Sequence, residues 1–476
     1  MSEISDFGVV VLLVSAGVFL AVLAMRVAER VSLPNAAFFL VAAGVLAASS
    51  DSLRDALSIQ AVERIGVVAL VVILFDGGLH IGLGRFRRSA APILALGVVG
   101  TFATAGLVAL AAHYLLGLSW ITAGLIGAAI APTDPAVTFS VFGAREIRGR
   151  AGTILEGEAG TNDPVGIALM IGMIELATED GGNLGIVVEE FLVEMTIGLG
   201  IGVVGALLLL PVLRRVPLTS PTLYPIRVLA GAGVIYGLAS VAHGSGFLAV
   251  FVAGVLLGDV AAPRKGEIET FHSSLAALAE IGAFAALGLS IGYSDLDDGS
   301  VWLEGLALAA ILAFVVRPLA IGPLLAPARL SRGEKAFIVW GGLKGAVPIL
   351  LGALAVLAAV DDAGRIYGIV FVVVLFSVLV QGGTIALAAE RLGVPFRKVD
   401  YDLTEVIEFV VRDDAFANGR AIGQLPLGTR AWVGVLIRDG RPTAFGPDTV
   451  LRAGDRVHVY SQPDAAAALK RIFAGD

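Results

Sequence analysis

The chain has 476 residues, of which 57% are hydrophobic and 16% charged, and its formal net charge is −8. A soluble protein usually carries about 25% charged residues, so the composition excludes a single soluble globule. The acidic balance excludes nucleic-acid binding, which needs a basic surface. Because the chain has no cysteine, disulfides, thiolate catalysis and Cys-ligated metals are excluded too. These numbers predict a protein that crosses a membrane many times.

Thirteen apolar stretches approach or exceed the length of a membrane-spanning helix, which needs about 20 residues. They are residues 7–25, 33–50, 62–83, 89–116, 119–142, 151–176, 184–213, 226–243, 245–259, 273–293, 301–325, 335–358 and 365–389. Loops after the odd-numbered spans, together with the adjoining ends of the next spans, hold 19 Lys and Arg residues, whereas the opposite side holds three. By the positive-inside rule, this alternation predicts an outside N-terminus and a cytoplasmic C-terminus. We therefore expect an all-α polytopic membrane domain over residues 1–395.

The composition changes after about residue 400. Three strand-length apolar runs, EVIEFVV, AWVGVLI and DRVHVY, are separated by the turn signals RDG, FGPDT and AGD. A final stretch, PDAAAALKRIF, has the pattern of a helix. We expect residues 400–476 to form a small α+β domain on the cytoplasmic side.

Two short motifs recur at one offset. AGVL begins at Ala43 and again at Ala253, and GLHIG at Gly78 is matched by GLSIG at Gly288, so that both offsets are 210 residues. This offset moves the second span onto the ninth and the third onto the tenth. Because a shift of seven spans reverses direction across the membrane, the sequence predicts an inverted repeat, which is typical of secondary transporters.

Two spans carry a charge and an interruption at positions related by this offset. In residues 119–142, APTDPA places Thr133 and Asp134 between two prolines, and in residues 335–358, GGLKGAVPI places Lys344 among glycines. Helical hydrogen bonds must break at both places, and matching breaks indicate a transporter site. Asp134 can neutralise the positive ends of the half-helices and Lys344 the negative ends. A structural role and an ion-binding role are therefore both open, and the hydroxyl of Thr133 offers oxygen to a cation.

Further charges lie inside the span at 151–176. Asp163 is thirteen residues from the basic edge at Arg150, a depth of about 20 Å and near the midplane. Arg317, in the span at 301–325, is similarly deep and needs a carboxylate partner. The candidate partners are Glu156, Glu158, Asp163 and Asp134. If Arg317 takes Glu158, Asp163 is left beside Asn162 as a buried carboxylate for which protons and cations compete.

Acidic residues in other spans allow two interpretations. Asp76, in VVILFDGGLHIG, is either an ion ligand or a satisfied polar residue. His80, one turn later, is either its pH-sensing partner or, as we expect, a histidine at the level of the lipid headgroups. Glu156 and Glu280 lie toward the cytoplasmic ends of their spans. They are expected to line an entrance funnel.

These motifs together resemble those of the monovalent cation:proton antiporters. APTDPA, EGEAGTNDP, an Arg in the eleventh span and GGLKGAVPI occur in the family's order over residues 5–395. ILFDGGL and GGLKGAVP are similar to the cell-volume-regulation branch of bacterial K⁺/H⁺ or Na⁺/H⁺ antiporters. The tail, with NGRAIGQLPL and GVLIRDGRPTAFGPDTVLRAGDRVHVY, resembles the C-terminal ligand-binding subdomain of regulators of K⁺ conductance (RCK).

The resemblance implies a homodimer in which the fifth and twelfth spans cross as broken helices. It implies that Asp163 is the carboxylate shared by cation and proton, and that Asn162 marks the Asn-Asp branch, which is usually electroneutral. Thr133 and Asp134 would complete the monovalent-cation site, and Asp76 would match the family's acid in the third span.

Two further assignments follow from the same resemblance. Glu158 would form a charge-compensating pair with Arg317, which leaves Lys344 as the remaining buried base. Ala159 stands where some relatives carry an ion-coordinating Ser, and this difference is compatible with a larger ion such as K⁺.

We expect electroneutral exchange of K⁺ and/or Na⁺ for protons by alternating access across the bacterial inner (plasma) membrane, contributing to cation, pH and cell-volume homeostasis. No Walker motif or nucleophile elbow is present, so neither enzyme activity nor a cofactor is expected. The alternative function is a ligand-gated cation channel or channel subunit, against which the inverted repeat argues. The expected partners are K⁺ or Na⁺, H⁺, membrane lipid and a second copy of the chain. Residues 400–476 either bind a small regulatory ligand of unknown identity or stabilise the dimer without one.

Overall fold

The computed structural model describes most of the chain. The described residues are 17, 19, 22, 23, 34–49, 57–134, 137–138, 142, 145–147, 149–179, 183–290, 299–398, 405–427, 431–461 and 466–474. They form two compact units, residues 1–397 and 398–476. The first predicted span, 7–25, lies almost entirely outside the described residues.

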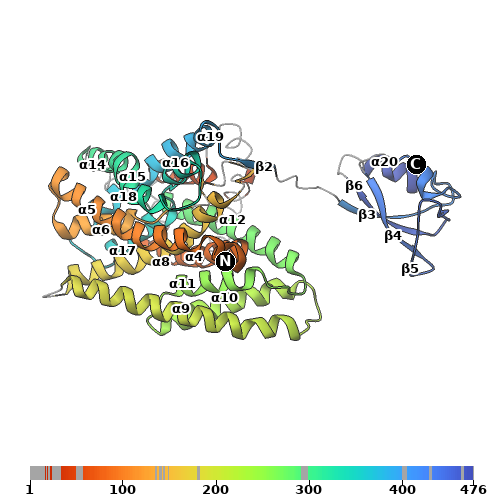
Figure 1. Cartoon of the computed structure of the whole chain (residues 1–476), viewed down its shortest axis with the longest axis horizontal. Coiled ribbons are helices and arrows are strands. Elements are labelled where there is room, and N and C mark those ends of the chain that lie inside the picture. The colour runs from red at the N-terminus through yellow and green to blue at the C-terminus, as the bar shows by residue number, and fades with distance from the viewer. Residues whose placement is uncertain are drawn as a thin grey trace, which may run out of the picture. The chain divides into compact units, whose positions relative to one another are not determined.

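The first unit is built of helices, with one short two-stranded sheet of β1 (Arg145–Ile147) and β2 (Phe396–Lys398) (Figure 1). In chain order its described helices are α2 (Asn35–Ser49), α4 (Ile59–Leu94), η1 (Ala95–Gly100), α5 (Thr101–Leu116), α6 (Trp120–Ile130), α8 (Arg150–Thr178), α9 (Leu184–Arg215), α10 (Leu223–Val241), α11 (Gly246–Gly258), α12 (Lys265–Leu289), α14 (Gly299–Ile311), η2 (Leu312–Val316), α15 (Arg317–Leu325), α16 (Arg332–Trp340), α17 (Ala346–Leu357), α18 (Ala363–Phe376), η3 (Ser377–Gln381) and α19 (Gly382–Arg391). Each predicted span from residue 33 onward overlaps one of these helices or consecutive ones, and the end of the 119–142 span lies largely outside the described residues. The mostly helical, membrane-spanning architecture is confirmed.

Six helical stretches among the described residues are long and apolar enough to cross a membrane. The longest, Ile59–Leu116, contains two predicted spans. It turns at Gly82, where φ is +63° and only glycine is unstrained. The carboxylate of Asp259, after the end of α11, accepts a hydrogen bond of 2.5 Å from the N–H of Gly84 just beyond this turn. The third and fourth spans are therefore joined by a sharp turn rather than by a loop.

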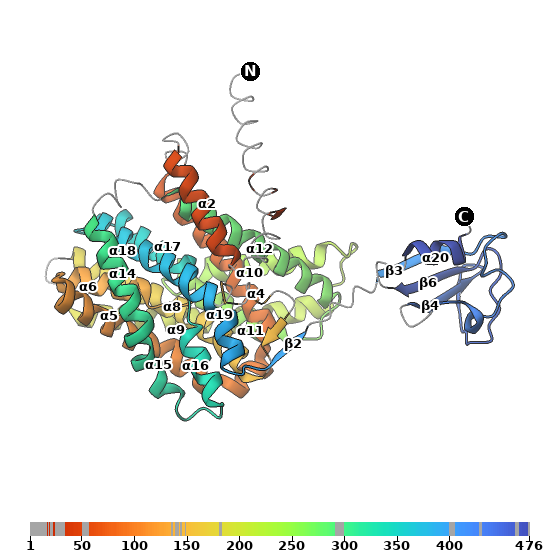
Figure 2. The same ribbon diagram turned by 90° about the horizontal axis from the view of Figure 1, so that it is seen from above.

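The glycines of the repeated motifs lie at two helix–helix contacts that the 210-residue offset exchanges. A Cβ on Gly288 of α12 would lie 2.6 Å from the carbonyl oxygen of Leu40 and 3.2 Å from the backbone nitrogen of Gly44 in α2. A Cβ on Gly78 of α4 would lie 2.6 Å from the carbonyl oxygen of Phe251 and 3.0 Å from the Cα of Gly254 in α11. Gly44 and Gly288 map onto Gly254 and Gly78, as a two-fold relation between the halves requires. Figure 2 shows α2 beside α12.

Both predicted helix interruptions are present. The helix α6 ends at Ile130, and the chain from Ala131 to Asp134 is not helical. The helices α16 and α17 are separated by a non-helical stretch over residues 341–345. The two interruptions touch, because the N–H of Asp134 donates a 2.8 Å hydrogen bond to the carbonyl of Leu343.

The second unit is a small α+β domain. Its four strands, β3 (Glu405–Val410), β4 (Ala431–Arg438), β5 (Arg441–Thr443) and β6 (Arg456–Ser461), form an antiparallel sheet in the order β3-β6-β4-β5. A 3-10 turn, η4 (Ile422–Gln424), precedes β4, and α20 (Ala466–Phe473) ends the domain. The unit has a hydrophobic core of its own, which includes Leu436, Val457, Val459 and Phe473. The predicted strands and terminal helix are confirmed.

Candidate functional site

The two interruptions are held together by charges on backbone dipoles. The ammonium of Lys344 is 1% exposed and donates to the carbonyls of Ala131 and Pro132 at 2.7 and 2.9 Å, where α6 ends. The carboxylate of Asp134 lies against Gly345, directly before the start of α17, because a Cβ on that glycine would overlap it. Each charge therefore lies at the end of a half-helix whose dipole it compensates.

Arg317 is 2% exposed and donates hydrogen bonds to three acceptors. Its Nη2 donates to Oε1 of Glu158 at 2.9 Å and to the carbonyl of Ile338 at 3.3 Å, and its Nε donates to the carbonyl of Val339 at 3.0 Å. The two carbonyls belong to the last turn of α16, where helical partners are missing. The ion pair expected from the sequence is thus present, and it also caps the helix that leads into the second interruption.

Gly342 is required by this arrangement. A Cβ at Gly342 would overlap the Arg317 guanidinium, as one at Gly345 would overlap Asp134. The motif GGLKG therefore leaves room for two charged side chains around Lys344.

Thr133 and Asn162 bind each other. The amide of Asn162 donates to the Thr133 hydroxyl at 2.8 Å, and the N–H of Thr133 donates to Oδ1 of Asn162 at 3.3 Å. These bonds fasten α8 to the first interruption. Neither side chain is among those that line the cavity described next.

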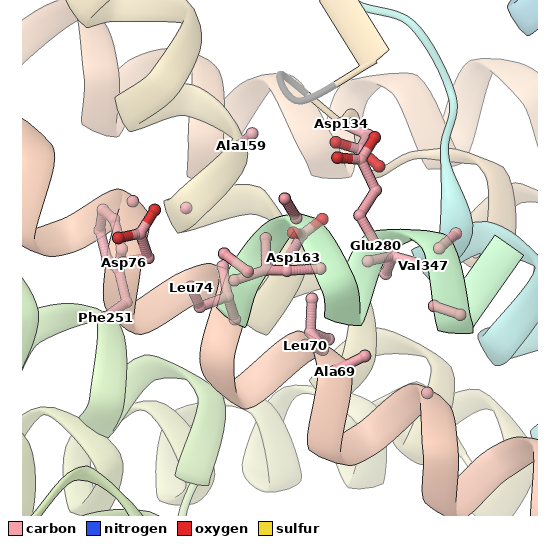
Figure 3. A pocket seen from close by; sticks show the side chains of 18 of the residues that line it. Ala69, Leu70, Leu74, Asp76, Asp134, Ala159, Asp163, Phe251, Glu280 and Val347 are labelled. Atoms are coloured by element: carbon pink, nitrogen blue, oxygen red, sulfur yellow. The ribbon is translucent and has the colours of Figure 1, made fainter. Parts of the chain in front are cut away.

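A cavity of about 350 Å³ reaches the crossing of the broken helices. Its walls come mainly from α4, α8, α12 and α17, and most lining residues are apolar or small (Figure 3). The polar and charged residues of its lining are Asp76, His80, Asp134, Glu156, Asp163, Ser273 and Glu280. The structure thus brings three of the predicted site residues, Asp163, Asp134 and Asp76, to one cavity.

Asp163 has the least compensated charge among the predicted site residues. It is 4% exposed, and its Oδ1 is buried without a hydrogen-bond partner among the described residues. It follows Asn162 on α8, so the Asn162–Thr133 bonds position it beside the interruption. A buried carboxylate with an unused oxygen, facing a cavity, can take up a proton or a cation.

Asp76 lies at the more exposed end of the cavity. Its Oδ1 is 3.3 Å from Nδ1 of His80 and accepts from the hydroxyl of Ser273 on α12 at 3.3 Å. The side chain of His80 is 47% exposed, whereas that of Asp76 is 15% exposed. Asp76 is therefore bonded to neighbours and separated in Figure 3 from Asp163 and Asp134.

Two residues that hold the second interruption were not singled out from the sequence. The Ser377 hydroxyl accepts from the N–H of Lys344 at 2.9 Å and donates to Oε1 of Gln381 at 2.8 Å, and Gln381 donates to the carbonyl of Trp340 at 3.4 Å. Both lie in the π-helical turn η3. The sequence does contain a pattern that could have identified them, because Ser and Gln four residues apart in an otherwise apolar span point to one side of a helix.

The structure has the features of a secondary transporter. Its two halves contact each other through repeat-related glycines, its broken helices meet near buried charges, and a cavity ends at that point. The chain belongs to the sodium/hydrogen exchanger family, whose transmembrane region matches residues 5–391. Residues 406–474 match the TrkA-C domain.

Curated relatives match most of the chain. The K(+)/H(+) antiporter NhaP of Alkalimonas amylolytica is 33% identical over 429 residues, which cover 86% of this chain and 74% of the relative. The K(+)/H(+) antiporter NhaP2 of Shewanella sp. (strain ANA-3) is 31% identical, with 95% and 81% covered. The Na(+)/H(+) antiporter NhaH of Halobacillus aidingensis is 30% identical, with 68% and 82% covered.

A solved structure has the same fold. It is the sodium proton antiporter MjNhaP1 from Methanocaldococcus jannaschii at pH 8, with a TM-score of 0.68 and 22% sequence identity. The similarity covers 79% of this chain and 99% of that one. The chain is accordingly a membrane-embedded secondary transporter of the cation/proton antiporter type and not an enzyme.

Proposed function

We propose that this protein exchanges K⁺ or Na⁺ for protons across the membrane, one for one. The observation that carries the proposal is Asp163, a buried carboxylate with an unpartnered oxygen at the inner end of the cavity. One carboxylate that binds either a proton or a monovalent cation gives an electroneutral cycle. Gradient-driven exchange then needs only that the site face one side of the membrane at a time.

The other buried charges have supporting roles in this proposal. Lys344 and Asp134 hold the half-helices, and Arg317 with Glu158 caps α16. Thr133 and Asn162 position Asp163 through their mutual hydrogen bonds, and either can turn an oxygen toward a cation when the site closes on it.

Two observations favour K⁺ over Na⁺ as the substrate. Ala159 lines the cavity and offers no side-chain oxygen, which leaves a roomier and less demanding ligand set. Two of the three relatives described above are named K(+)/H(+) antiporters. None of the three is named as a channel, so nothing favours the ligand-gated alternative.

The membrane setting and the tail extend the proposal. The bias of basic residues supports an outside N-terminus and a cytoplasmic C-terminus in a bacterial inner membrane. We propose a homodimer in which residues 400–476 adjust exchange in response to a small cytoplasmic ligand.

The test is exchange in proteoliposomes that carry a proton gradient and a pH-sensitive dye. Addition of K⁺, Na⁺, Rb⁺ or Li⁺ should dissipate the gradient with the wild-type protein, and clamping the voltage should not change the rate. Asp163→Asn should abolish exchange while leaving the size-exclusion profile unchanged, because an amide cannot bind the proton. Asp361→Asn, in an exposed turn, is the matched control and should behave as wild type.

Proton-coupled exchange that persists in Asp163→Asn would refute the assignment of the carboxylate. A rate that follows the imposed voltage would refute the one-for-one stoichiometry, since each net charge moved is worth about 2.3 kcal/mol per 100 mV.

A further inference from the structure

Glu280 reaches the crossing of the broken helices from a different helix than the predicted site residues. It lies on α12, which packs against α2 and α4. One face of α12 lines the cavity, and along it Ser273 is followed about 10 Å further by Glu280. In Figure 3 the Glu280 side chain extends from α12 toward the carboxylate of Asp134.

The Glu280 carboxylate, like that of Asp163, lacks the compensation that Glu158, Arg317 and Lys344 have. Its Oε1 is buried and has no hydrogen-bond partner among the described residues. The nearby cations are engaged elsewhere, because Lys344 donates to the carbonyls of Ala131 and Pro132, and Arg317 donates to Glu158 and α16. A second carboxylate, that of Asp134, faces it instead (Figure 3).

Two carboxylates that approach each other in a poorly hydrated site are stabilised when either a proton or a cation lies between or beside them. Among the described residues that line the cavity, the one base is His80, and it lies at the Asp76 end and not beside these carboxylates. The oxygens of Thr133 and Asn162 are used in their mutual hydrogen bonds. Of the described side chains, the carboxylates of Asp163, Asp134 and Glu280 are the ones that offer oxygen at the inner end.

We propose that Glu280 is a further cation ligand, which holds the transported monovalent cation together with Asp134 and Asp163. The proposal rests on the exchange function proposed above and adds a residue from a helix that carries none of the sequence-predicted site residues. In this arrangement α12 contributes directly to cation affinity and does not merely line an entrance.

The ionisable groups that share the cavity with Glu280 determine how cation affinity at this site depends on pH. They are Asp134 at the interruption, Asp163 and Glu156 on α8, and Asp76 and His80 on α4. The helices α2 and α17, which also pack on α12, carry no charged side chain, and Arg227 lies near the start of α10.

Replacing Glu280 by Gln removes one negative charge from the ligand set at nearly constant volume. We expect Glu280→Gln to raise the KM for K⁺ and Na⁺ about tenfold at pH 8.5, with the maximal rate changed less than twofold. The ratio to wild type should shrink as the pH falls, because protonation of Glu280 removes the same charge as the substitution. Glu280→Asp should restore most of the affinity. Glu267→Gln, on the same helix but with a 45% exposed side chain, is the control and should match wild type.

A second measurement needs no variant and no transport. A hydrophobic carbodiimide labels protonated buried carboxyls, and mass spectrometry of the labelled wild-type protein reports on Glu280 directly. K⁺ or Na⁺ should protect Glu280 from labelling, with half-protection near the KM.

The outcomes separate the two proposals. A wild-type KM and pH dependence in Glu280→Gln, together with labelling of Glu280 that cations do not alter, would overturn its role as a ligand while exchange itself stands. Protection of Glu280 by cations in a protein that shows no exchange would support the ligand and refute the proposed function.

Discussion

Arg317 and Lys344 show how a buried cation can be held in a membrane protein. Each donates to two backbone carbonyls where a helix ends or is interrupted, and Arg317 also pairs with Glu158. The carbonyls at such ends have no hydrogen-bond donor within the helix, and the membrane core provides no water as a donor. A fixed positive charge therefore satisfies several acceptors at once, whereas Asp163 retains an unused oxygen.

Removing the Arg317 side chain should strongly reduce the stability of the folded protein. Arg317→Ala leaves Glu158 and the end of α16 without a donor, and breaking a buried ion pair typically costs about 3–5 kcal/mol. We expect a much lower yield of folded protein and a lower midpoint of thermal unfolding, measured by size-exclusion chromatography after heating. Arg317→Lys should recover only part of the loss, because one ammonium cannot reach all three acceptors in the same fork. Wild-type yield and thermal stability in Arg317→Ala would contradict the role given to this residue.

At the scale of elements, the interfaces of α2 with α12 and of α4 with α11 depend on glycine. Gly44, Gly78, Gly254 and Gly288 let backbones approach so closely that a Cβ on three of them would lie 2.6 Å or less from a carbonyl oxygen of the facing helix. Small residues at such contacts are typical of helix packing in membranes. The recurrence of AGVL and GLHIG/GLSIG in the sequence thus has a steric cause.

Two glycines related by the repeat should respond alike to a methyl group. We expect Gly78→Ala and Gly288→Ala each to destabilise the membrane unit by about 1–3 kcal/mol, the usual effect of overpacking. Gly237→Ala, on α10 with no atom within 4 Å of the added Cβ, should be neutral or slightly stabilising. Thermal unfolding of the three purified variants gives the comparison. A destabilisation confined to one of the repeat-related pair would argue against equivalent contacts.

The sequence predicted the spans from residue 33 onward, both interruptions and the tail because each depends on local composition. It also identified Arg317 as a buried base that needs a carboxylate, but it left four candidate partners, and the family resemblance selected Glu158. It did not identify Ser377 and Gln381, whose role depends on η3 packing beside the second interruption. Glu280 was predicted to line an entrance funnel, because the position of a residue along its span does not reveal which other helices its side chain approaches.

At the scale of the whole molecule, the tail unit has its own core and an ion pair of its own, in which the carboxylate is buried. Arg438 donates to Asp455 from Nε at 2.8 Å and from Nη2 at 2.7 Å, and the N–H of Arg452 adds a third bond at 2.8 Å. Burial acts to raise the pKa of the Asp455 carboxyl, but these hydrogen bonds outweigh it and hold the pKa below its usual value. The pair joins the end of β4 to the start of β6.

This pair should make tail stability depend on pH in a definite direction. A carboxyl whose pKa is lowered by folding adds stability above its ordinary pKa near 4, and the gain is lost as the pH falls through the lowered value. We expect Asp455→Asn to destabilise the tail by about 2 kcal/mol at pH 7. Limited proteolysis of the full-length protein should cleave the tail of the variant faster, and the difference from wild type should vanish in acid. Equal cleavage at pH 7 would contradict this account, and altered exchange in the variant would support regulation by the tail.

The exchanged glycine contacts have a consequence for how such a protein can be assembled. Gly44 lies against Gly288 and Gly254 lies against Gly78, so each half of the membrane unit contributes corresponding glycines to its contacts with the other half. Two separate chains of half the length, inserted in opposite directions, could form this interface with each other. The membrane unit therefore has the geometry of an antiparallel dimer of half-length chains joined into one polypeptide. Fusion would free each half to diverge, so that one interruption carries an acid and the other a base.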